Sequence, residues 1–253
     1  MPDLFGLDGR VAVVTGGGRG LGAAACRALA AAGAHVVAAD LRGGDAVAAE
    51  ITAAGYGAEA AVLDVTDRAA VRACLDRVEA RHGGIGILVN NAAITLRDPA
   101  YAFPPEKFDA LVDVNMRAAY YTARDAAVRM RAAGGGAIVN IASIGGQVVD
   151  GERSSVYDMT KAAVIQMTRN QAYEWAPDGI RVNAVAPGYM RTAMTEELLP
   201  DPETTAALVR AHIPLGRIGE PADLAGPIVF LASPAAGYVT GHTLNVDGGW
   251  VIT

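Results

Sequence analysis

Short apolar runs alternate with longer alanine-rich stretches along the whole chain. The apolar runs are rich in valine and isoleucine, which is typical of strands buried on both faces. The alanine-rich stretches are long enough for helices, and Gly33 and Gly55 stand where two of them should end. The pattern predicts strands at about 11–15, 35–40, 58–64, 85–90, 137–141, 181–186 and 243–246, and helices at about 20–32, 45–54, 67–81, 105–131, 155–176 and 221–232.

Continuously apolar strands separated by helices predict an α/β fold with a parallel sheet. Helices then cover both faces of the sheet, which is the doubly wound (Rossmann) architecture, here with seven strands. The chain has 253 residues and shows no internal repeat, low-complexity tract or linker. We therefore expect residues 1–253 to form a single domain.

The segment 189–215 departs from this rhythm. It follows an expected strand and carries Pro200, Pro202 and Pro214. An insertion at the carboxyl end of a parallel strand lies where such folds bind their ligands. We expect this segment to form a lid over a substrate.

Charge and composition narrow the possible partners. The formal net charge is -6, and no cluster of lysine and arginine is present, which argues against binding to nucleic acid. No stretch of about 18 apolar residues lacks helix breakers, so we expect no membrane span. The first ten residues do not have the pattern of a signal peptide. A cytoplasmic protein that acts on a small molecule is the expectation.

The cysteines and histidines give no sign of a metal centre. Cys26 and Cys74 fall in expected helices and resemble small buried apolar groups more than ligands. The histidines stand far apart and make no short-spaced ligand pair, so the sequence predicts no metal site: His35, His82, His212 and His242.

A glycine-rich turn links the first expected strand to the first expected helix. Its sequence is Thr15-Gly-Gly-Gly-Arg-Gly-Leu-Gly22. Glycines allow a tight turn and let the backbone approach a pyrophosphate, while the helix start offers free N–H groups. Alone, the turn is equally consistent with an ordinary loop. Its place after the first strand of a βαβ unit favours a dinucleotide-binding domain.

Asp40 closes the second expected strand. A carboxylate at this position can accept hydrogen bonds from both hydroxyls of an adenosine ribose, and it repels a 2′-phosphate. Arg19 and Arg42 complicate the choice, since each has the length to reach such a phosphate. We give Asp40 more weight and expect NAD as the cofactor.

Tyr157 and Lys161 stand four residues apart on an expected helix, and therefore on one face. A nearby ammonium lowers the high pKa of a phenol, which lets Tyr157 exchange a proton with an alcohol or ketone. Ser143 follows the fifth expected strand, at the same end of the sheet, and its hydroxyl can hydrogen-bond the reacting oxygen. Asn115 lies inside an expected helix, where asparagine is unfavourable, and a local distortion there would turn its backbone carbonyl toward water.

Several motifs in order make the sequence resemble the short-chain dehydrogenases/reductases over essentially the whole chain. The match rests on Thr15-Gly16-x-x-x-Gly20-x-Gly22, on Asn90-Asn91-Ala92-Ala93, on the tetrad Asn115, Ser143, Tyr157 and Lys161, and on Pro187-Gly188 with Thr192.

This resemblance implies the strand order 3-2-1-4-5-6-7 and hydride transfer between a nicotinamide and a secondary alcohol or ketone. Asn115 would hold a water molecule of a proton relay. Lys161 would bind the ribose of the nicotinamide half, and Thr192 would bind the carboxamide. Asp64 and Val65 would flank the adenine, and Ile94 would lie near the cofactor. The expected cofactor-binding set is Gly16, Arg19, Gly20, Leu21, Gly22, Asp40, Leu41, Asp64, Val65, Asn91, Ala92, Ala93, Tyr157, Lys161, Pro187, Gly188, Met190 and Thr192.

The sequence departs from the family's pattern in two places. Ala93 stands where the family usually has glycine, and the interval from Ser143 to Tyr157 is about one residue longer than usual. Neither change removes a functional atom, so we expect an altered loop with retained chemistry.

The segments 186–190, 219–233 and 246–250 look nearest to sugar-acid members of the family, the gluconate 5-dehydrogenases and 2-deoxy-gluconate 3-dehydrogenases. We therefore expect a polyol, a sugar or a sugar acid as substrate. Arg97, Arg153 and Arg191 are candidates to hold a carboxylate, although solvated surface arginines are the commoner case.

Two other readings stay open. The first is a 3-oxoacyl thioester reductase that uses NADPH and acts on an acyl carrier protein, which the acidic charge and Asp40 disfavour. The second is a catalytically silent NAD-binding regulator, which would have lost tetrad residues. The resemblance also implies a homotetramer, with the helices that carry Asn115 and Tyr157 at one interface and the segment 247–250 at another.

Overall fold

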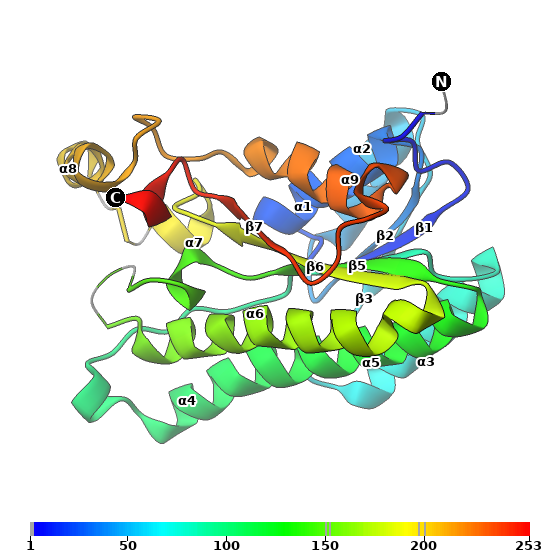
Figure 1. Cartoon of the computed structure of the whole chain (residues 1–253), viewed down its shortest axis with the longest axis horizontal. Helices are drawn as coiled ribbons and strands as arrows, with labels where there is room; N and C mark the ends of the chain where they lie inside the picture. Colours follow the sequence, from blue (N-terminus) through cyan, green and yellow to red (C-terminus); the bar gives the residue numbers. More distant parts are fainter. Residues whose placement is uncertain (1–2, 150, 152, 197, 200) are drawn as a thin grey trace.

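One parallel sheet forms the centre of the computed structural model, which describes residues 3–149, 151, 153–196, 198–199 and 201–253 (Figure 1). Its seven strands lie in the order β3-β2-β1-β4-β5-β6-β7. This confirms the predicted doubly wound sheet and the strand order implied by the family resemblance. The strands are β1 (Val11–Thr15), β2 (His35–Asp40), β3 (Ala58–Val62), β4 (Ile87–Asn90), β5 (Gly136–Ile141), β6 (Ile180–Pro187) and β7 (Thr243–Val246).

The central strands are mostly apolar because they supply side chains to a core on each face of the sheet. In β1, Ala12 and Val14 belong to one buried cluster, whereas Val11 and Val13 belong to the other. Side chains alternate between the faces along a strand, so a strand covered on both sides is apolar at most positions. Its buried polar residues are hydrogen-bonded: Asn140 donates to Thr168 Oγ1 at 2.9 Å, and Asn183 donates to the carbonyl oxygen of Val239 at 2.8 Å.

The helices form a layer on each side of the sheet (Figure 1). The core on one face is made with α1 (Gly20–Ala31), α2 (Gly44–Ala53) and α9 (Ala225–Ala232). The opposite face is covered by α3 (Arg68–His82), α5 (Ala119–Ala132) and α6 (Ser155–Trp175). Asp67 caps α3 by accepting hydrogen bonds from the N–H groups of Ala69 and Ala70.

Two predicted helices differ from the observed ones for local reasons. The helix expected at 105–131 is divided into α4 (Pro105–Leu111), a π-helix (Val112–Ala118) and α5. The helix expected at 221–232 begins as a 3₁₀ turn (Pro221–Leu224) before α9. Pro227 explains the second break, since it has no N–H group with which to continue an α-helical ladder back to Asp223.

The predicted lid segment is largely helical, which the sequence pattern did not predict. It holds α7 (Ala193–Glu196) and α8 (Pro202–His212), while Pro200 lies outside the described residues. Pro202 occupies the first turn of α8, where its missing N–H costs nothing, and Asp201 caps the helix through the N–H of Thr204 at 2.8 Å. Pro202 therefore helps to begin a helix within the segment that departs from the expected rhythm of strands and helices.

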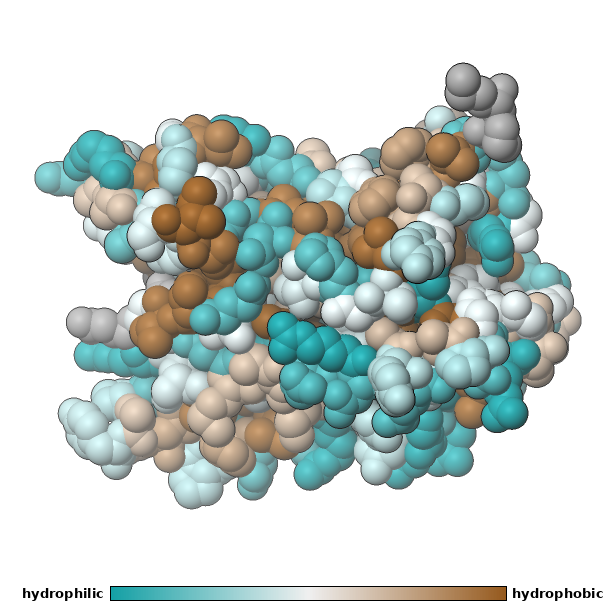
Figure 2. Space-filling view, in the orientation of Figure 1, coloured by the Kyte–Doolittle hydropathy of each residue, from teal (hydrophilic) through white to brown (hydrophobic). Residues whose placement is uncertain are grey.

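A small apolar cluster packs the segment 189–215 against the end of the chain. The ring of Trp250 stacks against Tyr189, with 5.0 Å between ring centroids, and against His212 at 4.6 Å. Ile144, Ile213 and Ile218 complete its buried part. Hydrophobic residues also gather on the surface at the end of the molecule that holds α7 and α8 (Figure 2).

Within the described part of the chain, no helix has both the length and the apolar character needed to cross a membrane. Cys26 and Cys74 are free and buried, and burial raises the pKa of the Cys26 thiol to about 12. Both cysteines therefore serve as small core residues, as the sequence indicated.

Candidate active site

A cavity of about 680 Å³ receives residues from the carboxyl ends of the strands, from α6 and from the lid. Eighteen of the twenty predicted site residues line it, whereas Gly22 and Asn115 lie behind its wall. The eighteen are Gly16, Arg19, Gly20, Leu21, Asp40, Leu41, Asp64, Val65, Asn91, Ala92, Ala93, Ser143, Tyr157, Lys161, Pro187, Gly188, Met190 and Thr192; Ile94 also lines it.

The glycine-rich turn owes its shape to positions where only glycine fits. Gly16 and Gly20 have φ angles of +63° and +52°, a region that side chains disfavour. A Cβ atom on Gly22 would lie 2.0 Å from the carbonyl oxygen of Gly16, so this glycine lets α1 pack directly against the turn. Gly22 therefore shapes the cavity from behind its wall.

The start of α1 is open to an anion. Its N-cap residue, Arg19, makes no side-chain capping bond, and no acidic residue occupies the first turn. The first N–H groups of the helix, with the positive end of its dipole, therefore remain available. These are the donors that a pyrophosphate needs, so the turn and the helix start fit a dinucleotide.

Thr15 and Asn91 fix the cavity floor where β1 and β4 end. The Thr15 hydroxyl accepts hydrogen bonds from the backbone N–H groups of Asn91, at 3.0 Å, and Ala92, at 3.2 Å. The Asn91 side chain in turn donates to the carbonyl oxygens of Thr15 and Gly16, both at 3.0 Å. These bonds hold the glycine turn against the neighbouring loop at the switch point of the sheet.

Asp40 lies at the end of β2, where the sequence predicted a ribose-binding carboxylate. Its oxygens accept hydrogen bonds from the N–H groups of Gly18, at 2.9 Å, and Arg42, at 3.1 Å. The carboxylate is thereby oriented at the cavity wall beside Leu41. Arg19 also lines the cavity, whereas Arg42 is not part of its lining.

Lys161 is buried in α6 beside the ring of Tyr157. Its side chain is 3% exposed, and Nζ donates a 2.8 Å hydrogen bond to the carbonyl oxygen of Ile141. Burial lowers the pKa of this amine to about 8, so it remains mostly protonated at neutral pH. Nζ lies 5.8 Å from the centre of the Tyr157 ring, close enough for the ammonium to favour a phenolate.

Ser143 stands opposite α6 at the end of β5. It is 7% exposed, and its Oγ accepts a 3.1 Å hydrogen bond from the N–H of Gly145, which orients the hydroxyl. Ser143, Tyr157 and Lys161 line the same cavity. The structure therefore brings together the three groups that the sequence predicted to surround a reacting oxygen.

Asn115 lies in the π-helix between α4 and α5, so the expected distortion of this helix is present. Its side chain forms two 2.9 Å hydrogen bonds with the backbone of Ile94, one as acceptor and one as donor, and a 3.2 Å bond to Thr160 Oγ. Thr160 belongs to α6, which carries Tyr157. Asn115 thus ties the loop after β4 to the helix of the tyrosine.

Of the two departures from the family's pattern, the alanine at position 93 introduces no backbone strain. Ala93 does not have a positive φ angle, because Arg153, at +63°, is the one residue other than glycine that does among those described. The methyl group of Ala93 is therefore accommodated without backbone strain. Asp150 and Glu152, in the longer interval before Tyr157, lie outside the described residues.

The sequence did not predict several apolar residues of the wall. Leu63, Ile141 and Ala142 stand at strand ends, so the rule that such folds bind ligands there points to them. Other wall residues have no sequence signal, because loops and the lid bring them in through tertiary packing: Thr95, Leu96, Val114, Ile144, Tyr189, Ala193, Met194, Thr195 and Leu198.

A doubly wound sheet, an uncapped helix behind a glycine turn and a tyrosine with a buried lysine in the same cavity define a nicotinamide-dependent oxidoreductase. Comparison with known proteins agrees. A family model described as Enoyl-(Acyl carrier protein) reductase matches residues 16–251.

Three similar proteins match nearly end to end. A 2-dehydro-3-deoxy-D-gluconate 5-dehydrogenase of Escherichia coli (strain K12) is 41% identical, over 98% of this chain and 97% of its own. A galactitol 2-dehydrogenase (L-tagatose-forming) of Cereibacter sphaeroides is also 41% identical, over 98% of each chain. The crystal structure of a gluconate 5-dehydrogenase from Burkholderia cenocepacia J2315, in complex with NADP and tartrate, has 40% identity and a TM-score of 0.95, covering 99% of this chain and 98% of that one.

The chain belongs to the short-chain dehydrogenase/reductase family. It is an oxidoreductase that transfers a hydride between a nicotinamide cofactor and an alcohol or ketone, which confirms the predicted reaction class.

Proposed function

We propose that this enzyme is an NAD-dependent dehydrogenase of a polyol, sugar or sugar acid. The observation that carries the cofactor choice is Asp40 at the cavity wall, with both carboxylate oxygens oriented by backbone N–H groups. The names of the similar proteins support the substrate class, since they act on gluconate derivatives and galactitol.

In this proposal the dinucleotide lies across the carboxyl edge of the sheet. The glycine turn and the start of α1 hold the pyrophosphate, and Asp64 and Val65 flank the adenine. Lys161 binds the nicotinamide ribose, while Pro187, Gly188, Met190 and Thr192 face the nicotinamide. When bound, the cofactor supplies or accepts the hydride.

Asp40 favours NAD for an electrostatic reason. Its oriented oxygens accept hydrogen bonds from the ribose hydroxyls, whereas a 2′-phosphate would place negative charge against them. Arg19 lines the cavity and is the group that would offset this repulsion. The structure of the Burkholderia protein contains NADP, so this choice requires its own measurement.

The chain's own residues manage the proton. In oxidation the Tyr157 phenolate accepts the proton of the substrate hydroxyl, and in reduction the phenol donates it to the ketone oxygen. Lys161 stabilises the phenolate, and the Ser143 hydroxyl donates a hydrogen bond to the reacting oxygen. Asn115, which lies in the π-helix, is the residue that we propose to hold a relay water through its backbone carbonyl.

Arg97 is the residue we propose for a substrate carboxylate. Among the three candidate arginines it lines the cavity, whereas Arg153 and Arg191 are not part of the lining. A Cβ atom on Gly151 would lie 3.4 Å from Arg97 Nη1 and 3.5 Å from the Tyr189 hydroxyl, so both side chains approach this glycine. A planar guanidinium at such a place can bind a carboxylate through two hydrogen bonds.

The two alternative functions make different predictions. A carrier-protein reductase using NADPH would prefer the phosphorylated cofactor, which Asp40 disfavours. A silent regulator would lack catalytic groups, whereas Ser143, Tyr157 and Lys161 are present and line one cavity.

The test is steady-state turnover of gluconate, its keto derivatives, galactitol and a bulky apolar ketone with NAD and with NADP. We expect kcat/KM to be higher with NAD and with the polar substrates. Arg97→Gln should raise KM for sugar acids about tenfold and leave polyols unchanged, with Arg191→Gln as the matched control. A clear NADP preference contradicts the cofactor proposal, and turnover of the apolar ketone alone contradicts the substrate class.

We also propose the homotetramer that the family resemblance implies. The helices α5 and α6 carry exposed apolar side chains that suit an interface: Tyr120 and Val128 on α5, and Met159 and Tyr173 on α6. Light scattering should give four times the chain mass of 25.9 kDa, and a monomer mass would contradict this state.

A further inference from the structure

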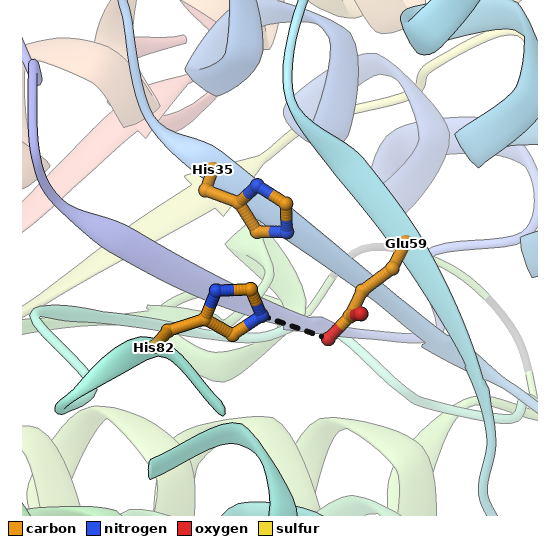
Figure 3. Close-up of side chains that lie close together, drawn as sticks. All are labelled: His35, Glu59 and His82. Atoms are coloured by element: carbon orange, nitrogen blue, oxygen red, sulfur yellow. Dashed lines mark hydrogen bonds and ion pairs between the residues drawn. The ribbon is translucent and has the colours of Figure 1, made fainter. Parts of the chain in front are cut away.

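Three ligand-type side chains meet at the amino edge of the sheet, opposite the catalytic cavity. His35 begins β2, Glu59 lies in β3 and His82 ends α3. One ligand atom from each residue lies within 4.8 Å of the others. The two imidazole rings and the carboxylate face a common space (Figure 3).

The alternation of the strands and the period of α3 explain this meeting. His35 lies on the same face as Val37, two residues along β2, and Glu59 is the register partner of Val37 in β3. On α3, Val71, Leu75 and Val78 form the buried face, and His82 lies on the same face one turn after Val78. Three polar residues therefore occupy the last positions of an otherwise apolar interface.

The arrangement of the side chains is close to that of a metal site. His82 Nε2 lies 3.1 Å from Glu59 Oε1. A tetrahedral Zn²⁺ site, with bonds of about 2.0–2.2 Å, places its ligand atoms roughly 3.3 Å apart. Two ligands already have this spacing, and His35 needs to approach by at most roughly 1.5 Å.

His35 is the residue that a hydrogen-bonded cluster does not explain. Its Nε2 atom is buried and has no hydrogen-bond partner among the described residues. Its ring lies 4.3 Å from that of His82, centre to centre. A Cβ atom on Gly57 would lie 2.7 Å from His35 Nδ1, so glycine makes room for this ring.

The charges around the cluster define the strength of the site. Glu59 supplies one negative charge. Arg81 opposes a cation, since its Nη1 lies 2.6 Å from Glu59 Oε2.

We propose that His35, Glu59 and His82 form a site for a divalent transition-metal cation of the Zn²⁺ type, with water as the fourth ligand. The site links the end of α3 to β2 and β3, at the far end of these strands from the cofactor. It is therefore a stabilising site, and its occupancy changes resistance to unfolding without changing turnover. Spacing along the sequence argued against a metal site because the fold alone brings these histidines together.

The test uses the full-length protein without a histidine tag, stripped of metal by a chelator. Calorimetric titration with ZnCl₂ should show one equivalent bound with a Kd at or below about 10 µM. His35→Gln and His82→Gln should each weaken this binding by more than about 100-fold. His242→Gln, which changes an exposed histidine elsewhere, is the matched control and should have no effect.

Two further measurements test the proposal without relying on the histidine variants. Arg81→Gln should tighten Zn²⁺ binding about fivefold, because it removes the opposing charge. Saturating Zn²⁺ should raise the Tm of the wild type by about 5–10 °C and leave KM unchanged. Circular dichroism and NADH binding check that each variant is folded.

Three outcomes would overturn the proposal: no stoichiometric uptake by the wild type, uptake that persists when both His35 and His82 are replaced, or an affinity that Arg81→Gln leaves unchanged. The first would mean that the cluster is a hydrogen-bonded polar cap. The second would place the ion elsewhere, and the third would show that the ion does not contact Glu59.

Discussion

The side of the cavity that we propose for the cofactor is shaped by a glycine turn of the backbone, whereas the side that we propose for the substrate is shaped by packed side chains. On the cofactor side, Gly16, Gly20 and Gly22 set the turn, and the uncapped start of α1 supplies N–H groups. On the substrate side, the lid rests on Trp250. The backbone geometry of the turn requires glycine at fixed intervals, so the turn can be recognised as a motif in the sequence. Packing can be achieved by many side chains, and this freedom lets the lid change with the substrate.

Tyr157→Phe should have the largest effect, and it should change turnover without changing cofactor binding. The variant keeps the ring but removes the hydroxyl that carries the proton, so kcat should fall on the order of 10³-fold, about 4 kcal/mol. Cofactor binding should persist, because the cofactor side is untouched. Stopped-flow turnover and NADH fluorescence measure the two effects separately. Undiminished turnover would contradict the proposed chemistry.

Lys161 joins the two sides and should give a pH-dependent signature. Burial lowers its pKa from 10.5 to about 8, so between these values the unfolded chain binds more protons than the folded protein. The buried charge therefore costs about 3 kcal/mol below pH 8, and this cost disappears as the pH rises to about 10.5.

Urea unfolding of the wild type and of Lys161→Met at pH 7.5, 9 and 10.5 tests this expectation in the cofactor-free protein. The free energy of unfolding of the wild type should rise relative to that of the variant across this range. A constant difference between them would show that the amine is not desolvated.

Gly22→Ala should damage the cofactor side alone. Its new methyl group would lie 2.0 Å from the Gly16 carbonyl oxygen, and the turn must shift to relieve the overlap. Cofactor Kd should rise about 30-fold, or about 2 kcal/mol. Gly226→Ala is the matched control, since no atom lies within 4 Å of its added Cβ. Equal cofactor affinities in the two variants would contradict the assigned role of the turn.

Trp250→Ala should loosen the substrate side and have the smallest effect of the four. Removing the ring that stacks on Tyr189 and His212 should raise substrate KM about fivefold, about 1 kcal/mol, with cofactor Kd unchanged. Trp175→Ala, at the end of α6, controls for general loss of packing. A KM that changes equally in both variants would mean that Trp250 does not act through the lid.

The difference between the two sides also explains what could be predicted from the sequence. The strands, their order and the glycine turn with Asp40 follow from periodicity and from the family's motifs. The helices α7 and α8 were not predicted, because the segment 189–215 was treated as an insertion that interrupts the strand-helix rhythm, although Pro202 begins a helix capped by Asp201. A distortion of the helix at Asn115 was predicted, because asparagine is unfavourable within a helix. The π-helical form of this distortion was not predicted, and the side chain of Asn115 there bonds to Ile94 and Thr160, which are distant in the sequence.

Residues that meet only through tertiary structure had no signal along the chain. Arg97 could be named among three arginines, but the fold was needed to place it in the cavity wall. His35 and His82 are far apart in the sequence, and they meet because the fold places the end of α3 beside the start of β2.

Because the start of α1 is uncapped, we expect the dinucleotide to stabilise the fold as well as take part in the reaction. A bound dinucleotide would offer phosphate oxygens as partners to the first amide groups of this helix, which no side chain caps. Binding therefore consolidates the centre of the sheet, and the folded lifetime of the enzyme in a cell depends on the supply of its redox carrier.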